Sequence, residues 1–487
     1  SRFETLAARQ GPLSIETLRP ISQSIEQDHG TAAFYPFGWV VLDLSLTGAQ
    51  QSALWHMACW GVFTLGGFAL YAALRQMGLS RGWALLGPVC LLLTPPFFAH
   101  GHFNNKDIAL FSLSLCGLWQ SLALARRPGF ARGACFALCG ALAANTKVAG
   151  LALWGLCALY VLVRLLMERR VTPRVWGVAG VTVLSFAALY ALLTPALWAD
   201  PAAFFGYLLS NAVAFQRWSG YVLFRGSVFD TTLQPLPWYY LPYMMLATTP
   251  LWILMLCAAG TALAMWTGVR RLRARGAPDL VPLLTVLLWL LPLAFAVLTG
   301  TRIYNGWRHF YFLYGPMLAL AVLGARGLWT HMRGARRRVF AALLGLCMAL
   351  TGVGIATQHP YQYAYYQPLV QLRGTDYNEL DYWNVSARDA LVRLAEAYEG
   401  ELTVEPADLW SDYALQRSLD VLPEDLAGRF ICLPEGGGAR FVLSNPTYAC
   451  FSGFAPEADM AACITLSAYG QPIMTLYEHT AKEAVQP

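Results

Sequence analysis

The chain has 487 residues, of which 57% are hydrophobic and only 13% are charged, and its formal net charge is +6. Soluble domains carry about 25% charged residues, so this composition excludes an ordinary soluble protein and indicates long segments within a bilayer. The segment 1–358 contains 27 basic and 10 acidic residues, whereas the segment 359–487 contains 7 basic and 18 acidic residues. The basic excess therefore predicts anchoring at one membrane face, and no nucleic-acid partner.

Ten apolar runs give the chain its predicted organisation. They cover residues 53–75, 82–98, 107–125, 131–145, 148–167, 174–198, 241–266, 279–300, 309–330 and 336–356. A membrane helix needs about 20 residues, so 82–98 and 131–145 are marginal. Because the chain begins at Ser1 with a segment expected outside the cell, we also expect one helix upstream. The prediction is an α-helical polytopic membrane protein with about 10–11 transmembrane helices.

Charge in the connections predicts the orientation. Every second connection is rich in arginine: Arg75, Arg81, Arg126, Arg127, Arg132, Arg164, Arg169, Arg170, Arg174, Arg270, Arg271, Arg273, Arg275, Arg333, Arg336, Arg337 and Arg338. The alternate connections hold few basic residues: Lys106, Lys147, Arg217, Arg225, Arg302 and Arg308. The positive-inside rule places the first set in the cytoplasm. The N-terminal segment, the second set and the tail are then extracytoplasmic.

Residues 1–52 form the first predicted extracytoplasmic loop. The stretch from Thr31 to Leu46 is apolar and aromatic but too short to span, so we expect it to lie in the membrane interface. Asp28 stands just before it. A carboxyl group desolvated beside a bilayer has a raised pKa, as a general base requires, so Asp28 is a candidate catalytic residue. The alternative is a solvated or helix-capping aspartate.

The next outer connection reads His100-Gly-His102-Phe-Asn104-Asn105-Lys106-Asp107, directly before a helix. Charges this close to hydrocarbon are costly and usually functional, and a lysine at a helix N-terminus suits a phosphate. Lys106 is therefore a candidate phosphate ligand. Asp107 is a second candidate catalytic residue, and His102 and Asn105 are candidates for sugar or acceptor binding. Two alternatives remain: Lys106 and Asp107 only cap and anchor the helix, or His100 and His102 bind a divalent cation without an evident third ligand.

Two further outer connections carry weaker signals. Asn145-Thr146-Lys147 fills a short turn, where Lys147 is either a site residue or a snorkelling anchor. The outer loop 199–240 begins with apolar residues at helical spacing after Asp200, which predict a second interfacial helix. The rest of this loop is rich in glycine, proline and aromatic residues. It contains Arg225, a weaker candidate for phosphate binding.

The segment Arg302-Ile-Tyr304-Asn305-Gly-Trp307-Arg308-His309-Phe-Tyr311 follows the eighth run. Arginine forks bind phosphate oxygens in pairs, and aromatic faces stack on sugar rings. We therefore expect Arg302 and Arg308 to bind phosphate, and Tyr304, Asn305 and His309 to contact a sugar or acceptor. The alternative is an ordinary aromatic belt at the membrane surface.

Residues 359–487 have the composition of a small globular α/β domain. Ser386 and Asp389 predict a capping box that opens a helix to about Tyr398, and strand-like runs lie near 402–404, 440–444 and 474–477. The acidic and aromatic residues Glu379, Asp381, Tyr382 and Trp383 either face the membrane site or, more simply, pack this domain. The three cysteines of the tail allow one disulfide whose pairing is open: Cys432, Cys450 and Cys463.

Four stretches in this order resemble the GT-C glycosyltransferases. This family includes the dolichyl-phosphate-mannose protein mannosyltransferases and bacterial relatives such as lipid A aminoarabinose transferase. The stretches are 102–107, 236–242 with Thr249-Pro250, 304–310, and 359–363 followed by 379–383. Each is weak alone, but the ordered set spreads over most of the chain. The resemblance implies a GT-C transmembrane domain over 53–358.

The resemblance also implies a sugar donor carried on a polyprenyl phosphate and inverting displacement chemistry at the extracytoplasmic face. Lys106 and Arg308 would then hold the donor phosphate, with Arg225 or Arg302 assisting, and Tyr239 would lie near the sugar. In the family an acidic pair follows the first transmembrane helix, which this chain lacks. The base is therefore Asp28 or an aspartate upstream of Ser1. The segment 366–374 also lacks the asparagine and paired glycines expected there.

The sequence thus predicts a glycosyltransferase in a bacterial inner membrane, with lipid bilayer and polyprenyl-phosphate sugar as partners. The alternative is a transporter or flippase for a lipid-linked or anionic solute, which predicts charges at mid-membrane and repeat symmetry, neither of which is evident. A third hypothesis is a non-catalytic membrane scaffold whose C-terminal domain binds a partner. The sequence does not identify the sugar or the acceptor, which could be a protein, a lipid or a glycan. It also does not show whether a divalent cation is required or what the oligomeric state is.

Overall fold

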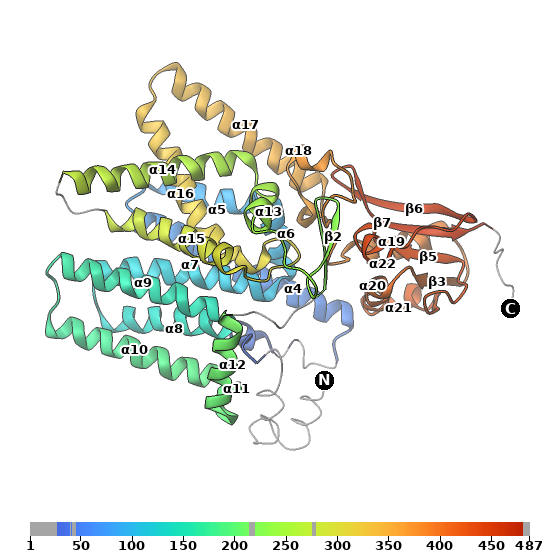
Figure 1. Cartoon of the computed structure of the whole chain (residues 1–487), viewed down its shortest axis with the longest axis horizontal. Helices are drawn as coiled ribbons and strands as arrows, with labels where there is room; N and C mark the ends of the chain where they lie inside the picture. Colours follow the sequence, from blue (N-terminus) through green and yellow to red (C-terminus); the bar gives the residue numbers. More distant parts are fainter. Residues whose placement is uncertain (1–26, 39, 41–44, 214–219, 275–278, 481–487) are drawn as a thin grey trace.

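The computed structural model describes residues 27–38, 40, 45–213, 220–274 and 279–480, as a bundle of long helices joined to a smaller α/β part. Figure 1 shows the bundle and, beside it, the sheet formed by the last third of the chain. Among the described residues, eight helices are long and apolar enough to cross a membrane, or nine if one bent pair is a single span. The chain is therefore a multi-pass α-helical membrane protein.

The helices follow the ten predicted runs closely. They are α4 (Gly48–Gln76), α5 (Arg81–Leu92), α6 (Pro95–Phe103), α7 (Asn105–Arg126), α8 (Phe130–Thr146), α9 (Val148–Met167), α10 (Pro173–Leu193), α13 (Tyr240–Thr248), α14 (Leu251–Arg273), α15 (Leu280–Thr299), α16 (Tyr314–His331) and α17 (Ala335–Thr357). The two marginal runs are the ones that fall short of a span. One is the 17-residue helix α8, and the other is the pair α5 and α6, which bends by 74°.

Prolines explain where the helices break. Pro95 and Pro96 follow the bend between α5 and α6, and Pro250 separates α13 from α14, although the run 241–266 predicted one helix. Proline lacks the N–H that a continuous helix needs, and it disfavours helical geometry at the preceding residue. Each break leaves a short helix, α6 or α13, at the end of the bundle that faces the sheet (Figure 1).

Glycine allows the closest helix packing in the bundle. A Cβ on Gly260 of α14 would lie 1.9 Å from the Leu320 carbonyl oxygen of α16, and one on Gly324 would lie 2.2 Å from the Leu256 carbonyl oxygen. Small residues at such crossings let two backbones approach without intervening side chains. In the chain, α14 comes directly after α13, and α16 comes directly after the short helix η2 (Arg308–Leu313).

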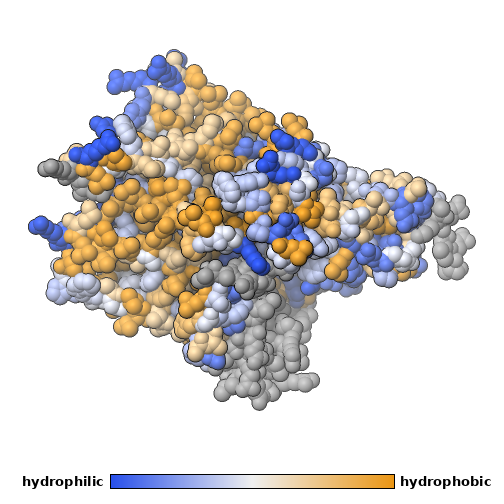
Figure 2. All heavy atoms as spheres, viewed as in Figure 1, coloured by the Kyte–Doolittle hydropathy of each residue, from blue (hydrophilic) through white to orange (hydrophobic). Residues whose placement is uncertain are grey.

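The two ends of the bundle differ as the charge pattern predicts. The arginine-rich connection α9–α10 and the arginine-rich last turn of α14 lie at the end away from the sheet (Figure 1). The bundle surface between the ends is mainly apolar, and the hydrophilic residues gather at the tips and on the α/β part (Figure 2). Both observations agree with a bundle that is embedded in lipid and carries the α/β part on one side.

Further short segments cover the end of the bundle nearest the sheet. They comprise η1 (Ala32–Phe37), α11 (Ala196–Ala199), α12 (Pro201–Val213) and the hairpin of β1 (Tyr221–Phe224) and β2 (Ser227–Asp230). The helix predicted after Asp200 is present as α12, and its place in the membrane interface stays a prediction. Of the stretch 31–46, η1 is described, and 39 and 41–44 lie outside the described residues.

The residues after α17 contain one mixed sheet with short helices. The strands are β3 (Leu402–Pro406), β4 (Phe430–Cys432), β5 (Phe441–Ser444), β6 (Met460–Ala468) and β7 (Gln471–His479), in the order β4-β3-β5-β7-β6. The helices are η3 (Gln362–Ala364), α18 (Pro368–Gln371), α19 (Ser386–Ala397), α20 (Leu409–Leu419), α21 (Glu424–Ala427) and α22 (Pro446–Ser452). All three predicted strands are present, and β4 and β6 were not foreseen.

Two details of the tail differ from prediction. The helix at Ser386 is present, but Asp381 caps it in place of the predicted capping box: its carboxylate accepts from the backbone N–H groups of Val385 at 3.0 Å and Ser386 at 3.1 Å. The three tail cysteines are free thiols. Cys432 and Cys463 lie on β4 and β6, the opposite edge strands of the sheet, and so are not placed to form a disulfide.

Candidate functional site

The first turn of α7 places Asp107 at the centre of a buried polar cluster. The Asn104 side chain caps α7 by accepting from the Asp107 N–H at 3.1 Å, and its amide donates to the Asp107 carboxylate at 2.9 Å. The same carboxylate forms an ion pair with Lys147, which lies between α8 and α9. Only 3% of the Asp107 side chain and 9% of that of Lys147 are exposed. Two buried charges are tolerated when each satisfies the other, and this pair meets that condition.

His309 extends the cluster on the other side of Lys147. Its Nδ1 lies 3.2 Å from the Lys147 Nζ. An ammonium group only donates hydrogen bonds, so Nδ1 must accept, and the imidazole is neutral with its proton on Nε2. The ring of Tyr304 meets the His309 ring edge-on at 4.6 Å. Asp107, Lys147, Arg308 and His309 are called the Asp107 cluster below.

Arg308 has a side-chain donor that is not used within the cluster. Its Nη1 lies 4.0 Å from the Asp107 carboxylate, and its Nη2 donates to the Asn305 side-chain oxygen at 3.3 Å. The guanidinium carbon lies 5.2 Å from the centre of the Tyr304 ring and 4.8 Å from that of Trp383. The Nε atom is buried and has no hydrogen-bond partner among the described residues. Such an orphaned donor on an arginine points to a ligand that completes it.

Glu379 connects the Asp107 cluster to the sheet-bearing part of the chain. Asn305 donates to the Glu379 carboxyl at 3.1 Å while its oxygen accepts from Arg308, so the glutamate orients the amide that positions the arginine. The backbone N–H of Leu223, on β1, also donates to Glu379 at 3.3 Å. Burial raises the pKa of the Glu379 carboxyl to about 7, against the lowering effect of these hydrogen bonds. The group therefore titrates near neutral pH.

His100 forms a second line of contacts on the same end of the bundle. The Asn104 amide donates to its Nδ1 at 3.2 Å, so Nε2 carries the proton and donates to the Tyr382 hydroxyl at 3.0 Å. His102, two residues on, turns away: its ring stacks on Trp60 at 4.2 Å and its Nδ1 contacts the Phe98 carbonyl oxygen at 2.9 Å. The two imidazoles thus serve different partners, and the hypothesis that they share a metal has no support in this arrangement.

Asp28 is buried on the loop before η1. Asn211 of α12 donates to its carboxylate at 3.2 Å. The loop is held over the α8–α9 turn, because the Gly30 N–H donates to the Asn145 carbonyl oxygen at 2.7 Å and the Ala32 N–H to the Asn145 side chain at 3.1 Å. Asn145 is two residues from Lys147. The fold therefore brings the first outer loop, with Asp28, to the element that supplies the cluster lysine.

The remaining predicted site residues divide into two groups. Asn105 and Lys106 are half-buried in the first turn of α7, beside Asp107, and Asn305 and Tyr304 contact Arg308 or His309 directly. Arg225 lies elsewhere, in the turn between β1 and β2. There it donates to the Tyr377 hydroxyl at 3.1 Å and faces the ring of Tyr239 at 5.9 Å.

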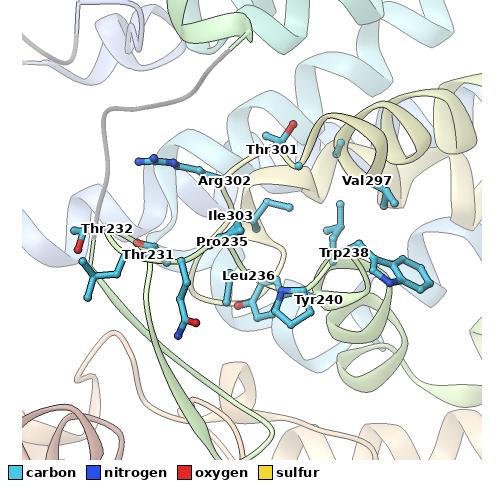
Figure 3. Close-up of a pocket in the computed structure, with 16 residues that line it drawn as sticks. Thr231, Thr232, Pro235, Leu236, Trp238, Tyr240, Val297, Thr301, Arg302 and Ile303 are labelled. Atoms are coloured by element: carbon cyan, nitrogen blue, oxygen red, sulfur yellow. The ribbon is translucent and has the colours of Figure 1, made fainter.

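Arg302 is exposed and lines a separate cavity of about 160 Å³. The walls of this cavity are the loop 231–238 and the end of α15, and Tyr240 forms part of the lining (Figure 3). The Gly306 N–H donates to the Tyr240 hydroxyl at 2.9 Å, so the cavity adjoins the loop that carries Arg308 without joining the cluster.

Three residues of the site were not among the predicted site residues: Lys147, Glu379 and Trp383. Lys147 carried the same signal as Lys106, a lysine in a short outer turn, but the sequence left open whether it was only an anchor. Glu379 and Trp383 were assigned more simply to domain packing. Both do pack the tail against the bundle, and they contact Asn305 and Arg308 in doing so.

The charges of the Asp107 cluster do not cancel. Lys147 and Arg308 are cationic, Asp107 supplies one negative charge, and His309 is neutral in the tautomer that its contact with Lys147 requires. A buried site with one net positive charge and a vacant arginine donor is suited to a phosphate monoanion. Among the described residues, three potential metal ligands come together only at Glu457, Asp459 and His479, in the sheet-bearing part and outside this cluster.

Comparison with known proteins adds a distant likeness in fold. No protein-family model matches the chain, and no curated protein matches it. One similar solved structure is the crystal structure of ArnT from Cupriavidus metallidurans bound to undecaprenyl phosphate. It is 14% identical, covers 89% of this chain and 84% of its own, and has a TM-score of 0.40. A likeness this distant carries no argument about activity or substrate.

Lys147→Met should destabilise the protein strongly, because it leaves Asp107 buried without its ion-pair partner, which costs about 3–5 kcal/mol. The measurement is thermal unfolding in detergent. Arg417→Gln is the control, because it removes a surface pair with Asp420 whose side chains are 67% and 63% exposed and which is worth at most about 1 kcal/mol. The double variant Asp107→Asn with Lys147→Met should recover part of the loss. Equal melting of Lys147→Met and Arg417→Gln would contradict the ion pair.

Glu379→Gln should make stability less dependent on pH. The folded state holds a proton on Glu379 up to about pH 7, whereas an unfolded chain releases it near its ordinary pKa, so the free energy of unfolding falls as pH rises through this window. Glutamine mimics the protonated acid, so the variant should gain about 2–3 kcal/mol over wild type at pH 8 and little at pH 4. Melting curves from pH 4 to 8 test this, with the exposed Glu396→Gln as control. Parallel curves for wild type and Glu379→Gln would exclude a raised pKa.

Proposed function

We propose that this protein is an integral membrane glycosyltransferase that takes a sugar from a polyprenyl-phosphate donor and passes it to an acceptor at the extracytoplasmic face of a bacterial inner membrane. The observation that carries the proposal is the Asp107 cluster: a buried lysine, an arginine whose side chain is 15% exposed and has a vacant donor, and one buried carboxylate, all at the end of a membrane bundle. Buried cations in a membrane protein are costly and mark functional sites. A phosphate on a lipid tail is the ligand that fits both the charge and the location.

The phosphate of the donor would complete the Arg308 fork and contact Lys147. Lys106, in the same turn as Asp107, is placed to add a third cation. Asp107 keeps the cations together before the donor arrives. Because the Asp107 carboxylate is already occupied by Lys147 and Asn104, it is a poor proton acceptor, and we assign it a positioning role. The rings of Tyr304 and Trp383, 5.2 Å and 4.8 Å from the guanidinium carbon, limit the positions that Arg308 can take.

The proposed reaction is an inverting displacement. The acceptor oxygen attacks the anomeric carbon, the bond from that carbon to the phosphate oxygen breaks, and the phosphate leaves with the electron pair. Asp28 takes the proton of the acceptor hydroxyl, since its loop lies over the turn that carries Lys147. Fixed cations that meet charge as it develops, in a site with little water, supply most of the rate enhancement in such reactions. The sugar and the acceptor are left open, as is a role for a divalent cation.

Undecaprenyl phosphate should raise the melting temperature of the wild-type protein, and undecaprenol, which lacks the phosphate, should not. A ligand that binds only the folded state at 100 times its dissociation constant stabilises by about 2.7 kcal/mol. Arg308→Gln should remove most of this gain, because the variant loses the charge and the donor fork. Arg388→Gln, a change at an exposed arginine paired with Asp389, serves as the control. Equal stabilisation by undecaprenol would mean that the tail alone binds and would contradict a phosphate site.

Asp28→Asn should reduce transfer without preventing donor binding. Loss of a general base costs about 10²- to 10⁴-fold in rate. Asparagine keeps an oxygen that can accept from Asn211, so the loop should stay in place. The measurement is release of undecaprenyl phosphate from a panel of synthetic undecaprenyl-phosphate sugars, with the melting shift by undecaprenyl phosphate recorded in parallel. Full activity in Asp28→Asn would exclude Asp28 as the base.

A further inference from the structure

The segment that follows α17 is attached to the bundle at two places. The Gln362 side-chain amide donates to the Ile355 carbonyl oxygen, in the last turn of α17, at 2.8 Å. The Gln367 backbone N–H donates to the Ala247 carbonyl oxygen at 2.7 Å, and the Gln367 side-chain amide donates to the Thr249 carbonyl oxygen at 3.0 Å. Both of these carbonyl groups lie at the break between α13 and α14. The segment is thus held where α17 ends and α14 begins, and Figure 1 shows α18 beside the end of α17, on the side of the sheet.

The arginines of α14 and α17 indicate where these helices leave the bilayer. Both helices are long and apolar enough to span, and each carries arginines only at the end away from the attached segment. Charged side chains stay out of hydrocarbon, and about 20 helical residues cross its thickness of about 30 Å. Counted from Arg270 on α14, the opposite boundary falls close to Pro250, and counted from Arg338 on α17 it falls close to Gln358. The segment is therefore attached at the boundary of the hydrocarbon.

Two leucines of this segment are turned outward. Leu369 of α18 is 76% exposed, and Leu372, which caps this short helix, is 83% exposed. Residues three apart in a helical turn lie on the same side, so the two side chains form one apolar tip. Val370, between them, packs against the core of the protein, and Arg373, after them, is exposed. An apolar tip with a neighbouring cation is typical of a segment that lies in the membrane interface.

The composition of the segment differs from that of the rest of the tail. Residues 359–375 contain no aspartate or glutamate, although the segment 359–487 contains 18 acidic residues. A carboxylate in contact with hydrocarbon is costly. The absence of acidic residues from the part of the tail attached to α14 and α17 is what contact with lipid requires.

We propose that residues 367–373, called the Leu369 turn below, insert into the surface of the bilayer. Leu369 and Leu372 contact the upper part of the acyl chains, and Arg373 lies at the level of the lipid phosphates. A partner protein is a poorer match, because each side of a specific protein interface buries about 800 Å², far more than two leucine side chains offer. The proposal does not depend on glycosyl transfer.

The Leu369 turn leads directly to the segment that completes the candidate site. Tyr366, just before the turn, donates its hydroxyl hydrogen to the Glu379 carbonyl oxygen at 2.7 Å. The Glu379 carboxyl accepts from Asn305, and Trp383 lies against Arg308. Contact of the turn with the bilayer therefore fixes the depth at which the sheet-bearing part meets the Asp107 cluster.

The test uses the full chain in phosphatidylcholine nanodiscs, with two labels read by peptide mass spectrometry. A phosphatidylcholine that carries a diazirine near the start of its acyl chain should label the Leu369 turn. It should also label Val353 of α17, which is 61% exposed and serves as the positive control. Hydroxyl radicals generated in water should oxidise Ile431 of β4, which is 41% exposed, and should leave Leu369 and Leu372 unmodified.

The variant Leu369→Asp with Leu372→Asp should lose lipid labelling of the turn, because two carboxylates would leave the hydrocarbon. Ile431→Asp is the matched control, an exposed apolar residue of the sheet replaced by the same acid, and should leave labelling of the turn unchanged. Labelling of Val353 in every variant verifies that the helices are still inserted.

Three results would overturn the proposal. The first is no lipid labelling of the Leu369 turn in a wild-type protein whose Val353 is labelled. The second is oxidation of Leu369 and Leu372 by hydroxyl radicals to the same extent as Ile431, since the leucines would then face water. The third is full lipid labelling of the turn in the double aspartate variant. Failure of undecaprenyl phosphate to stabilise the wild type would count against the proposed function and would leave this proposal unaffected.

Discussion

The buried ion pair between Asp107 and Lys147 is the interaction on which the end of the bundle nearest the sheet depends. It joins the start of α7 to the turn between α8 and α9, and neither charge could remain buried at a membrane surface without the other. Arg308 is attracted to this pair by the charge of Asp107, and His309 accepts a hydrogen bond from Lys147. The site is thus assembled from residues at the ends of several helices.

The sheet-bearing part of the chain completes this site. Trp383 covers one face of the Arg308 guanidinium, and Glu379 holds the amide of Asn305, which in turn holds the arginine. Glu379 also accepts from the backbone of the β1–β2 hairpin. Three segments distant in sequence therefore meet at one buried carboxyl group, whose raised pKa makes its protonation responsive to pH near neutrality.

Much of the fold could be predicted because membrane helices obey local rules. The apolar runs marked the helices to within a few residues, and the alternation of arginine predicted two unlike ends of the bundle. The predictions of helix boundaries and caps were wrong where a single residue overrode the local sequence pattern. Pro250 divided a run long enough to span, and Asp381, five residues before Ser386, capped α19 in place of the predicted capping box. Hydropathy alone does not register either effect.

The sequence by itself determined the class of the protein, the approximate bounds of its long helices and the connections that hold the unusual charges, because hydropathy and charge are properties of short segments. Only the tertiary structure decided that Lys147 is the buried partner of Asp107, that Arg302 and Arg225 lie apart from Arg308, and that Glu379 is part of the site. Which helix ends meet depends on packing across the bundle, and the spacing of residues along one segment holds no information about it.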